Sequence, residues 1–273
     1  MPASRSAMLS HNWLTMLDKG HRTMHCTYYL PVLCSSGIVG ATMTRLEDLS
    51  ESIQALFPGD IKKHWEIHEW RNATIILRHI HPQEWDDLIA VLRSFRLKRS
   101  DILKRGGNKS AIAARIDRDL YSRGWVEKQF DTKISVDGTV YETPTHSVDC
   151  FKNRVALEVE WNNKDPFYDR DLNNFRLLFE LRAIDLGIII TRSDELQQIF
   201  DNLGRGKSYG NSTTHMSKLL PRIDGGGAGG CPVLVFGIKS TLYVEDATPL
   251  SPEELAQGEL LEKAAAIEEE KED

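Results

Sequence analysis

The sequence has few cysteines, and their spacing excludes two classes of protein. Its 273 residues contain four, Cys26, Cys34, Cys150 and Cys231, which lie far apart and form no C-x-x-C pair. This spacing argues against a zinc ribbon and against the disulfide framework of a small secreted domain. A reducing, cytoplasmic location is therefore the expected one.

Long apolar runs are also absent. No run reaches the roughly 18 residues that a membrane-spanning helix needs. The nearest candidate, residues 28–43, is interrupted by Pro31 and Gly37 and follows a long polar lead, which is untypical of a signal peptide. We therefore expect no membrane partner. Residues 1–42 show little periodicity, so we expect a poorly ordered extension there, with Met43 as a candidate second start.

Positive charge is outnumbered in the chain as a whole, where 34 Lys and Arg stand against 40 Asp and Glu and give a formal net charge of −6. Residues 251–273 hold nine acidic residues against two lysines, a net of −7, so the remainder carries +1. Residues 93–128 hold eleven Lys or Arg and four acids, a net of +7. A neutral body with one basic segment is compatible with a polyanionic partner, because binding depends on where the charge lies. A solvated helical face is the alternative interpretation, and the acidic tail is expected to lie away from any DNA.

The composition is otherwise that of an ordinary globular protein, with 41% hydrophobic and 27% charged residues, and it predicts a single domain over residues 43–250. Apolar residues at spacings of three and four predict helices, and short alternating or continuous apolar runs predict strands. The alternation of strands and helices in the second half indicates an α/β fold. Helices are expected over residues 46–57, 82–95, 109–123, 172–183 and 193–203, and strands over 73–77, 148–151, 154–161, 186–191 and 232–238.

The most informative segment reads T-H-S-V-D-C-F-K-N-R-V-A-L-E-V-E-W, residues 145–161. Strict alternation in its second half predicts a strand with Glu158 and Glu160 on one face. If the strand is central, these two carboxylates are desolvated and repel each other. A cationic group is therefore expected near them.

A short strand over residues 148–151 is predicted to form a hairpin with this strand. A two-residue turn at Lys152-Asn153 would pair Asp149 with Ala156, which places Asp149 diagonal to Glu158 on the same face. The carboxylates of Asp149, Glu158 and Glu160 would then converge, and such a donor set suits one or two Mg²⁺ ions.

Divalent ions held in this way activate water and stabilise charge on the attacking and leaving oxygens of a phosphodiester. The pattern D-x8-E-x-E therefore predicts a hydrolytic nuclease. An ordinary hairpin with its acidic face in water is the alternative.

This segment, with N-N-K-D-P-F after it and L-G-I-I-I-T-R further on, resembles the core of restriction endonucleases of the BglII and BamHI kind, which belong to the PD-(D/E)XK nuclease superfamily. The resemblance implies a restriction-endonuclease-like mixed β-sheet flanked by helices, with Mg²⁺ as cofactor and Asp149 and Glu158 as metal-binding catalytic residues. Glu160 stands where most members of the superfamily have Lys. The BamHI type also has Glu at this position, so the identity of the general base stays open. Glu127 lies where some relatives bring an acidic residue towards the metals.

The same resemblance implies a type II enzyme that acts as a homodimer on double-stranded DNA. Its site would be palindromic, six bases long or degenerate, with a central GATC, and cut to leave 5′ extensions. A repair or structure-specific nuclease of the same fold stays open, as does a noncatalytic DNA-binding protein.

Three segments are candidates for contact with DNA, because each offers basic or polar side chains in a loop. Each also suits an ordinary surface loop. The candidates are Lys104, Arg105 and Lys109 before a helix, Asn162, Asn163 and Lys164 directly after the acidic strand, and Ser212, Thr213, Thr214 and His215 in the loop 205–215.

Overall fold

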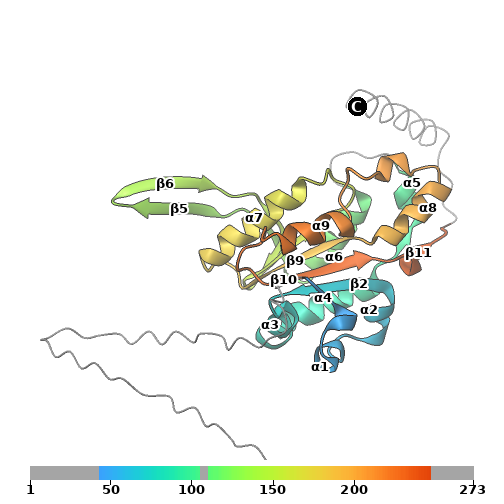
Figure 1. Ribbon diagram of the computed structural model, residues 1–273, viewed down its shortest axis with the longest axis horizontal. Coiled ribbons are helices and arrows are strands. Elements are labelled where there is room, and N and C mark those ends of the chain that lie inside the picture. Colours follow the sequence, from blue (N-terminus) through green and yellow to red (C-terminus); the bar gives the residue numbers. More distant parts are fainter. Residues whose placement is uncertain (1–42, 105–109, 247–273) are drawn as a thin grey trace, which may run out of the picture. The chain divides into compact units, whose positions relative to one another are not determined.

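The computed structural model describes residues 43–104 and 110–246. Two predicted segments, the extension over residues 1–42 and the acidic tail over 251–273, lie outside the described residues. The described part is a mixed α/β structure in which a seven-stranded mixed sheet is flanked by helices (Figure 1). The predicted fold class is confirmed.

The central strands of this sheet are parallel and the outer ones antiparallel. Strands β8, β9 and β10 run parallel to one another, and their neighbours β7 and β2 run antiparallel to them. Every residue of β9 and β10 is buried, because helices cover both faces, which explains why both strands read as continuous apolar runs. The order across the sheet is β1 (Thr44–Arg45), β2 (Trp65–Trp70), β10 (Val233–Ile238), β9 (Leu186–Arg192), β8 (Val155–Val159), β7 (Val148–Lys152) and β4 (Val126–Lys128).

Two sets of helices cover opposite faces of the sheet. One face packs mainly against helices from the first half of the chain, with the short helix of residues 197–202 beside them, and the other packs against two helices from the second half. The first set is α2 (Gly59–His64), α3 (Ala73–Ile80), α4 (Pro82–Ser94) and α6 (Ala111–Tyr121), and the second set is α7 (Phe167–Glu180) and α9 (Met216–Asp224). The shorter helices are α1 (Glu51–Gln54), α5 (Arg99–Leu103) and α8 (Gln197–Asn202).

Helix α7 lies very close to the sheet. A Cβ atom at Gly187 of β9 would lie 2.3 Å from Cδ2 of Phe175, so only glycine allows this approach. The same apolar layer contains Ala156 of β8 and Leu172 of α7. The start of α7 is thereby fixed beside the end of β8, where the acidic residues lie.

Two pairs of strands lie outside the main sheet. The short strands β3 (Leu97–Lys98) and β11 (Tyr243–Val244) pair in parallel. Strands β5 (Asp131–Val136) and β6 (Thr139–Pro144) form an antiparallel hairpin that extends away from the sheet (Figure 1). Its turn at Asp137-Gly138 has positive φ at both residues, 48° and 81°, and Asp-Gly is a typical sequence for such a turn.

Two of the predicted elements are wrong. Residues 73–77, predicted as a strand, belong to helix α3. The helix predicted over residues 46–57 is replaced by a 3₁₀ turn at Leu46–Asp48 and the short helix α1. Strand β2 and the β5–β6 hairpin were not predicted. The helix predicted over 82–95 and the strands predicted over 186–191 and 232–238 agree with the structure to within a residue.

Candidate active site

The β7–β8 hairpin at the centre of the site is closed by a two-residue turn. The turn residues are Asn153 and Arg154, with φ of 43° and 70°, which is the backbone of a type I′ turn. The predicted turn at Lys152-Asn153 is wrong by one residue, since Lys152 pairs with Val155 in the ladder. Arg154 is held by two hydrogen bonds to the carboxylate of Asp185, at 2.8 and 2.6 Å.

The observed register places Asp149 directly opposite Glu158. The ladder pairs Cys150 with Leu157 and Phe151 with Ala156, so the predicted pairing of Asp149 with Ala156 is wrong by two residues on β8. Because side chains alternate with a period of two, this shift leaves both acidic residues on the same face of the sheet.

Asp149 and Glu158 each accept a hydrogen bond from the backbone of the opposite strand. The backbone N–H of Asp149 donates to Oε2 of Glu158 at 3.2 Å, and that of Val159 donates to Oδ2 of Asp149 at 3.2 Å. Glu158 is only 1% exposed, and its other oxygen, Oε1, has no hydrogen-bond donor among the described residues. A buried carboxylate oxygen without a donor is costly, and it has a free lone pair for a ligand.

Glu160 follows β8 directly, and helix α7 supplies two further charged groups beside it. Its Oε2 accepts a hydrogen bond from Nδ2 of Asn163 at 2.8 Å, and its Oε1 lies 3.3 Å from Nη2 of Arg170. Arg170 also lies 2.8 Å from the carboxylate of Asp171, which is fully buried. Arg170 is thus the cation that the acidic strand was expected to require, whereas Asp171 was not predicted.

Burial raises the pKa of three of these carboxyl groups. Burial, and after it the charge of Asp171, raises the pKa of Glu160 to about 9 and that of Glu158 well above its usual range. Burial also raises the pKa of Asp171. Glu160 therefore binds a proton at neutral pH when no cation other than Arg170 balances the cluster.

The side-chain oxygens at this site suit a hard divalent ion, although the carboxylates do not point to a common centre in this structure. In residues 43–104 and 110–246, no three Asp, Glu, His or Cys side chains are arranged as a metal site. The reason is that Asp149 and Glu158 turn to backbone N–H groups and Glu160 turns to Asn163 and Arg170. Mg²⁺ prefers oxygen ligands of this kind, and the unpartnered oxygen of Glu158 supports the fit.

A pocket opens beside these residues, and the predicted Glu127 is close enough to influence one residue of its lining. Asp149, Glu160 and Arg170 line it together with His146. Partial burial, followed by the charge of Arg170, lowers the pKa of His146, while nearby carboxylates, including Glu127, oppose this effect. Glu127 is exposed on β4, where the pairing with β7 shifts by one residue.

Two of the three predicted DNA-contacting segments are joined. Lys164 forms an isolated bridge with Thr213, and the N–H of Thr214 donates to the carbonyl oxygen of Asn163 at 2.7 Å. The N–H of Asp165 donates to the carbonyl oxygen of Ser212 at 3.0 Å. The loop after β8 and the loop before α9 therefore form one surface next to Glu160.

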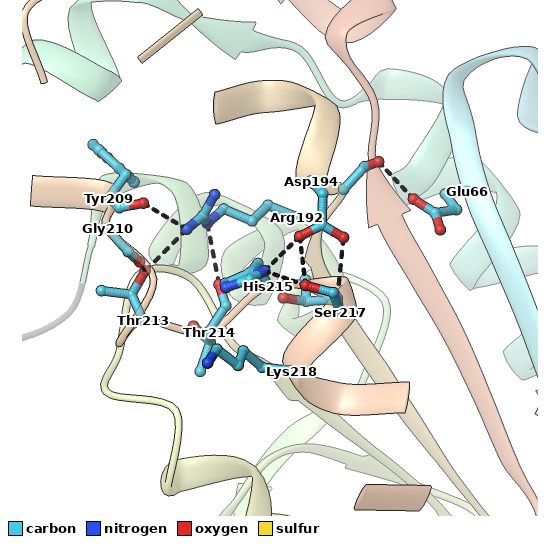
Figure 2. Close-up of polar contacts among 12 residues, drawn as sticks. Glu66, Arg192, Asp194, Tyr209, Gly210, Thr213, Thr214, His215, Ser217 and Lys218 are labelled. Atoms are coloured by element: carbon cyan, nitrogen blue, oxygen red, sulfur yellow. Dashed lines mark hydrogen bonds and ion pairs between the residues drawn. The ribbon is translucent and has the colours of Figure 1, made fainter. Parts of the chain in front are cut away.

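A buried arginine at the end of β9 holds the second loop. Arg192 is 1% exposed, and its guanidinium donates to the carbonyl oxygens of Tyr209 and Thr214 and to Oγ1 of Thr213, at 2.8 to 3.1 Å. Figure 2 shows this guanidinium among the three loop residues, with His215 beside Asp194 in an adjoining cluster.

Thr214 and His215, which were predicted to contact DNA, are buried in this structure and hold the loop in place. Ser212 and Lys164 are exposed, while Thr213, Asn162 and Asn163 are partly buried.

The third predicted segment lies largely outside the described residues, which exclude Arg105 and Lys109. Lys104 is exposed at the end of α5. Ser110 caps helix α6 by accepting a hydrogen bond from the N–H of Ala113 at 3.0 Å, and both residues line the pocket. The helix that follows this basic segment therefore begins at the pocket.

A mixed sheet whose central hairpin presents acidic residues beside a helix-lined pocket defines a protein of restriction-endonuclease-like fold. The family described as restriction endonuclease BglII/BglIII matches residues 65–238, and the chain belongs to this family. A comparison with curated proteins found no match. In the part of the chain that the structure describes, every helix is too short or too polar to cross a membrane.

Proposed function

We propose that this chain is a type II, site-specific endonuclease that hydrolyses double-stranded DNA with Mg²⁺. The observation that carries the proposal is the register of the β7–β8 hairpin, which sets Asp149 opposite Glu158 on one face and joins them by a hydrogen bond from the Asp149 N–H to Oε2 of Glu158, with Glu160 directly after β8. Membership of a restriction endonuclease family supports the same reaction class.

Asp149, Glu158 and Glu160 would hold the Mg²⁺. When bound, Mg²⁺ would make water a better nucleophile at neutral pH and stabilise negative charge on the phosphodiester oxygens. Because the pKa of Glu158 and that of Glu160 are raised, metal binding should release protons. Asn163 fixes the orientation of Glu160 through its amide.

The DNA would lie across the joined loops after β8 and before α9. The exposed side chains of Lys104, Lys164 and Ser212 suit contact with phosphates, and Arg105 and Lys109, which lie outside the described residues, are proposed as DNA contacts from the sequence alone. The DNA would contact Asn162, Asn163 and Thr213 at the edge of the same surface.

A homodimer is part of the proposal, because a protein with one active centre per chain needs two copies to cut both strands of a duplex. Two-fold symmetry of the protein would match a palindromic site. A central GATC and 5′ extensions are proposed from the likeness to the BglII and BamHI kind.

The decisive variants remove the buried carboxylate of Glu158. Glu158→Gln keeps the volume of the side chain and Glu158→Ala removes it, and both should abolish cleavage in Mg²⁺ while leaving DNA binding in Ca²⁺ largely intact. Glu180→Ala, which alters an exposed acid at the end of α7 that does not line the pocket, is the matched control and should cut within about tenfold of the wild type. Mg²⁺-dependent cutting that persists in both Glu158 variants would refute the proposal.

Digestion of a plasmid by the wild-type protein in Mg²⁺ separates the proposed function from its alternatives. Discrete fragments support a restriction enzyme. Nicks or smears would indicate a repair or structure-specific nuclease, and the absence of any product would indicate a noncatalytic DNA-binding protein.

A further inference from the structure

Arg170 brings positive charge into an otherwise acidic pocket. It lies in the first turn of α7, where its side chain is 34% exposed while its two carboxylate partners are 2% and 0% exposed. Its Nη2 is 3.3 Å from Oε1 of Glu160 and 2.8 Å from Oδ1 of Asp171, and its guanidinium lies over the ring of Phe167 at 4.4 Å from the centroid. Three neighbours therefore fix its position.

Among the described residues that line the pocket, Arg170 is the single one with a guanidinium or ammonium group. The face of β8 offers only Ala156 and acidic residues there. A phosphodiester that approached this pocket would be repelled by the carboxylates unless a cation offset their charge. Arg170 is the side chain of the described chain that can do so.

The guanidinium also has hydrogen-bonding capacity to spare. It has five N–H donors arranged in a planar fork that suits phosphate oxygens. Its Nε donates to Oδ1 of Asp171 at 2.9 Å and its Nη2 donates to Oε1 of Glu160, whereas Nη1 makes no hydrogen bond with the described residues. Asp171 can therefore keep Nε in place while the other nitrogens donate hydrogen bonds to a new partner.

We propose that Arg170 binds a phosphodiester group of the DNA substrate at the reaction site. This inference rests on the proposed function and adds to it a phosphate-binding residue. In the DNA-free protein the guanidinium balances Glu160 and Asp171. When DNA occupies the pocket, the free edge of the guanidinium donates to a phosphate oxygen, and Asp171 and the ring of Phe167 keep the group oriented.

The experiment measures how DNA affinity depends on salt, in Ca²⁺, for wild type, Arg170→Met and Arg170→Gln. Each phosphate contact contributes about 0.9 to the slope of log affinity against log salt concentration, so both variants should lower the slope by about one. Arg176→Met is the matched control: it removes the same charge from the same helix about 120° around its axis, and it should leave the slope unchanged. Arg176 donates to Asn173 and does not line the pocket.

Cleavage in Mg²⁺ gives the second readout. Loss of one stabilising donor at a reacting group costs about 10²-fold or more in rate, and this loss is expected for Arg170→Met and Arg170→Gln but not for Arg176→Met. A variant at Arg170 that loses cleavage but keeps the wild-type salt slope would overturn the proposal, because Arg170 would then only hold Glu160.

The possible failures are distinguishable. If wild type binds and cuts DNA while the slopes of both Arg170 variants equal that of wild type, only the proposal for Arg170 fails. If wild type neither binds DNA in Ca²⁺ nor cuts it in Mg²⁺, the proposed function fails, and Arg170 as a substrate contact fails with it. Thermal melts establish whether each variant is folded. If Arg170→Met does not fold, Arg170→Gln alone is used for both measurements.

Discussion

Glu160 is a residue whose surroundings determine its chemistry more than its type does. It is 2% exposed and lies beside Arg170, which also contacts Asp171. Burial and the charge of Asp171 raise its pKa to about 9, from an ordinary value of 4.5. Between these two pH values the folded protein binds a proton that the unfolded chain does not.

This difference predicts how stability changes with pH in EDTA. A carboxyl group whose pKa is raised by folding stabilises the folded state below its ordinary pKa, and this stability is lost as the pH rises towards the folded value. The free energy of unfolding should therefore fall as the pH rises from 5 to 9. Denaturant titrations at several pH values measure it, and Glu160→Gln, which cannot ionise, should show a weaker dependence. If the free energy of unfolding of Glu160→Gln depended on pH as strongly as that of wild type, protonation of Glu160 would not be the cause.

A cation at the same position should be harmful. Glu160→Lys would replace the carboxylate 3.3 Å from Arg170 with an ammonium group, so the two cations would repel each other and a proposed Mg²⁺ ligand would be lost. We expect this variant to lose cleavage, although Lys is the commoner residue in the superfamily that the segment resembles, and Glu160→Gln to retain some activity because its amide keeps an acceptor oxygen. Single-turnover cleavage over a range of Mg²⁺ concentrations measures both. A Lys variant that cuts at the wild-type rate would show that Glu160 is no part of the metal site.

At this scale the sequence identified the acidic residues of the hairpin but missed two that come from α7. The alternation around Glu158 and Glu160 was sufficient, because a strand of known phase fixes which side chains share a face. Asp171 and Arg170 could not be placed, because packing of α7 on the sheet brings them there. One signal was present: Asp171 lies on the apolar side of α7, between Tyr168 and Phe175, where a charged residue requires a partner.

At the scale of elements, long-range contacts determine the secondary structure where the sequence patterns are ambiguous. The hairpin turn lies at Asn153-Arg154 because Arg154 reaches Asp185 at the start of β9, and the local sequence does not show this contact. The prediction for residues 73–77 failed for a similar reason. Oε2 of Glu69 accepts a hydrogen bond from the N–H of Thr74 at 2.8 Å and so stabilises the start of α3, where short apolar runs alone do not distinguish a helix from a strand.

The close approach of α7 to β9 makes Gly187 sensitive to substitution. Gly187→Ala would place a methyl group against the ring of Phe175, with a nearest approach of 2.3 Å before relaxation. Overpacking of this kind costs about 1–3 kcal/mol, and displacement of α7 would move Arg170 and Asp171, so we expect lower stability and weaker cleavage. Denaturant titration and single-turnover cleavage measure the two effects.

Gly59→Ala is the matched control for this substitution, because no atom lies within 4 Å of the added Cβ and its φ is ordinary. It should leave both properties near the wild-type values. If Gly187→Ala behaved like this control, the packing of α7 would not be required for the site.

At the scale of the whole molecule, the site lies at the carboxyl ends of parallel strands β8 and β9. Glu160 follows β8, and Arg192 ends β9. Segments far apart in the sequence meet there, including the start of α7 and the loop before α9, and crevices at this edge of a parallel sheet are common binding sites. The sequence predicted the central strands β7 to β10 and the helices between them except α9, but it did not predict the outer strand β2 or the β5–β6 hairpin.

The distribution of charge along the chain gives a prediction for the acidic tail, which lies outside the described residues. Deletion of the residues after Pro249 removes a net charge of −7 contributed by residues 251–273. Specific cleavage should stay within about tenfold of wild type, and nonspecific DNA binding should become tighter at low salt because a repulsive charge is gone. Filter binding and plasmid digestion measure the two effects, and complete loss of cleavage would show that the tail belongs to the core or to a dimer interface.

The backbone hydrogen bonds between the loop after β8 and the loop before α9 have a consequence for engineering new specificities. The N–H of Thr214 donates to the carbonyl oxygen of Asn163 at 2.7 Å, and Lys164 pairs with Thr213. Arg192 holds the second loop by donating to the carbonyl oxygen of Thr214. Neither loop can be exchanged for that of a relative without breaking contacts to the other. A chimera would therefore have to transplant both loops as one cassette, together with the arginine on which the second loop rests.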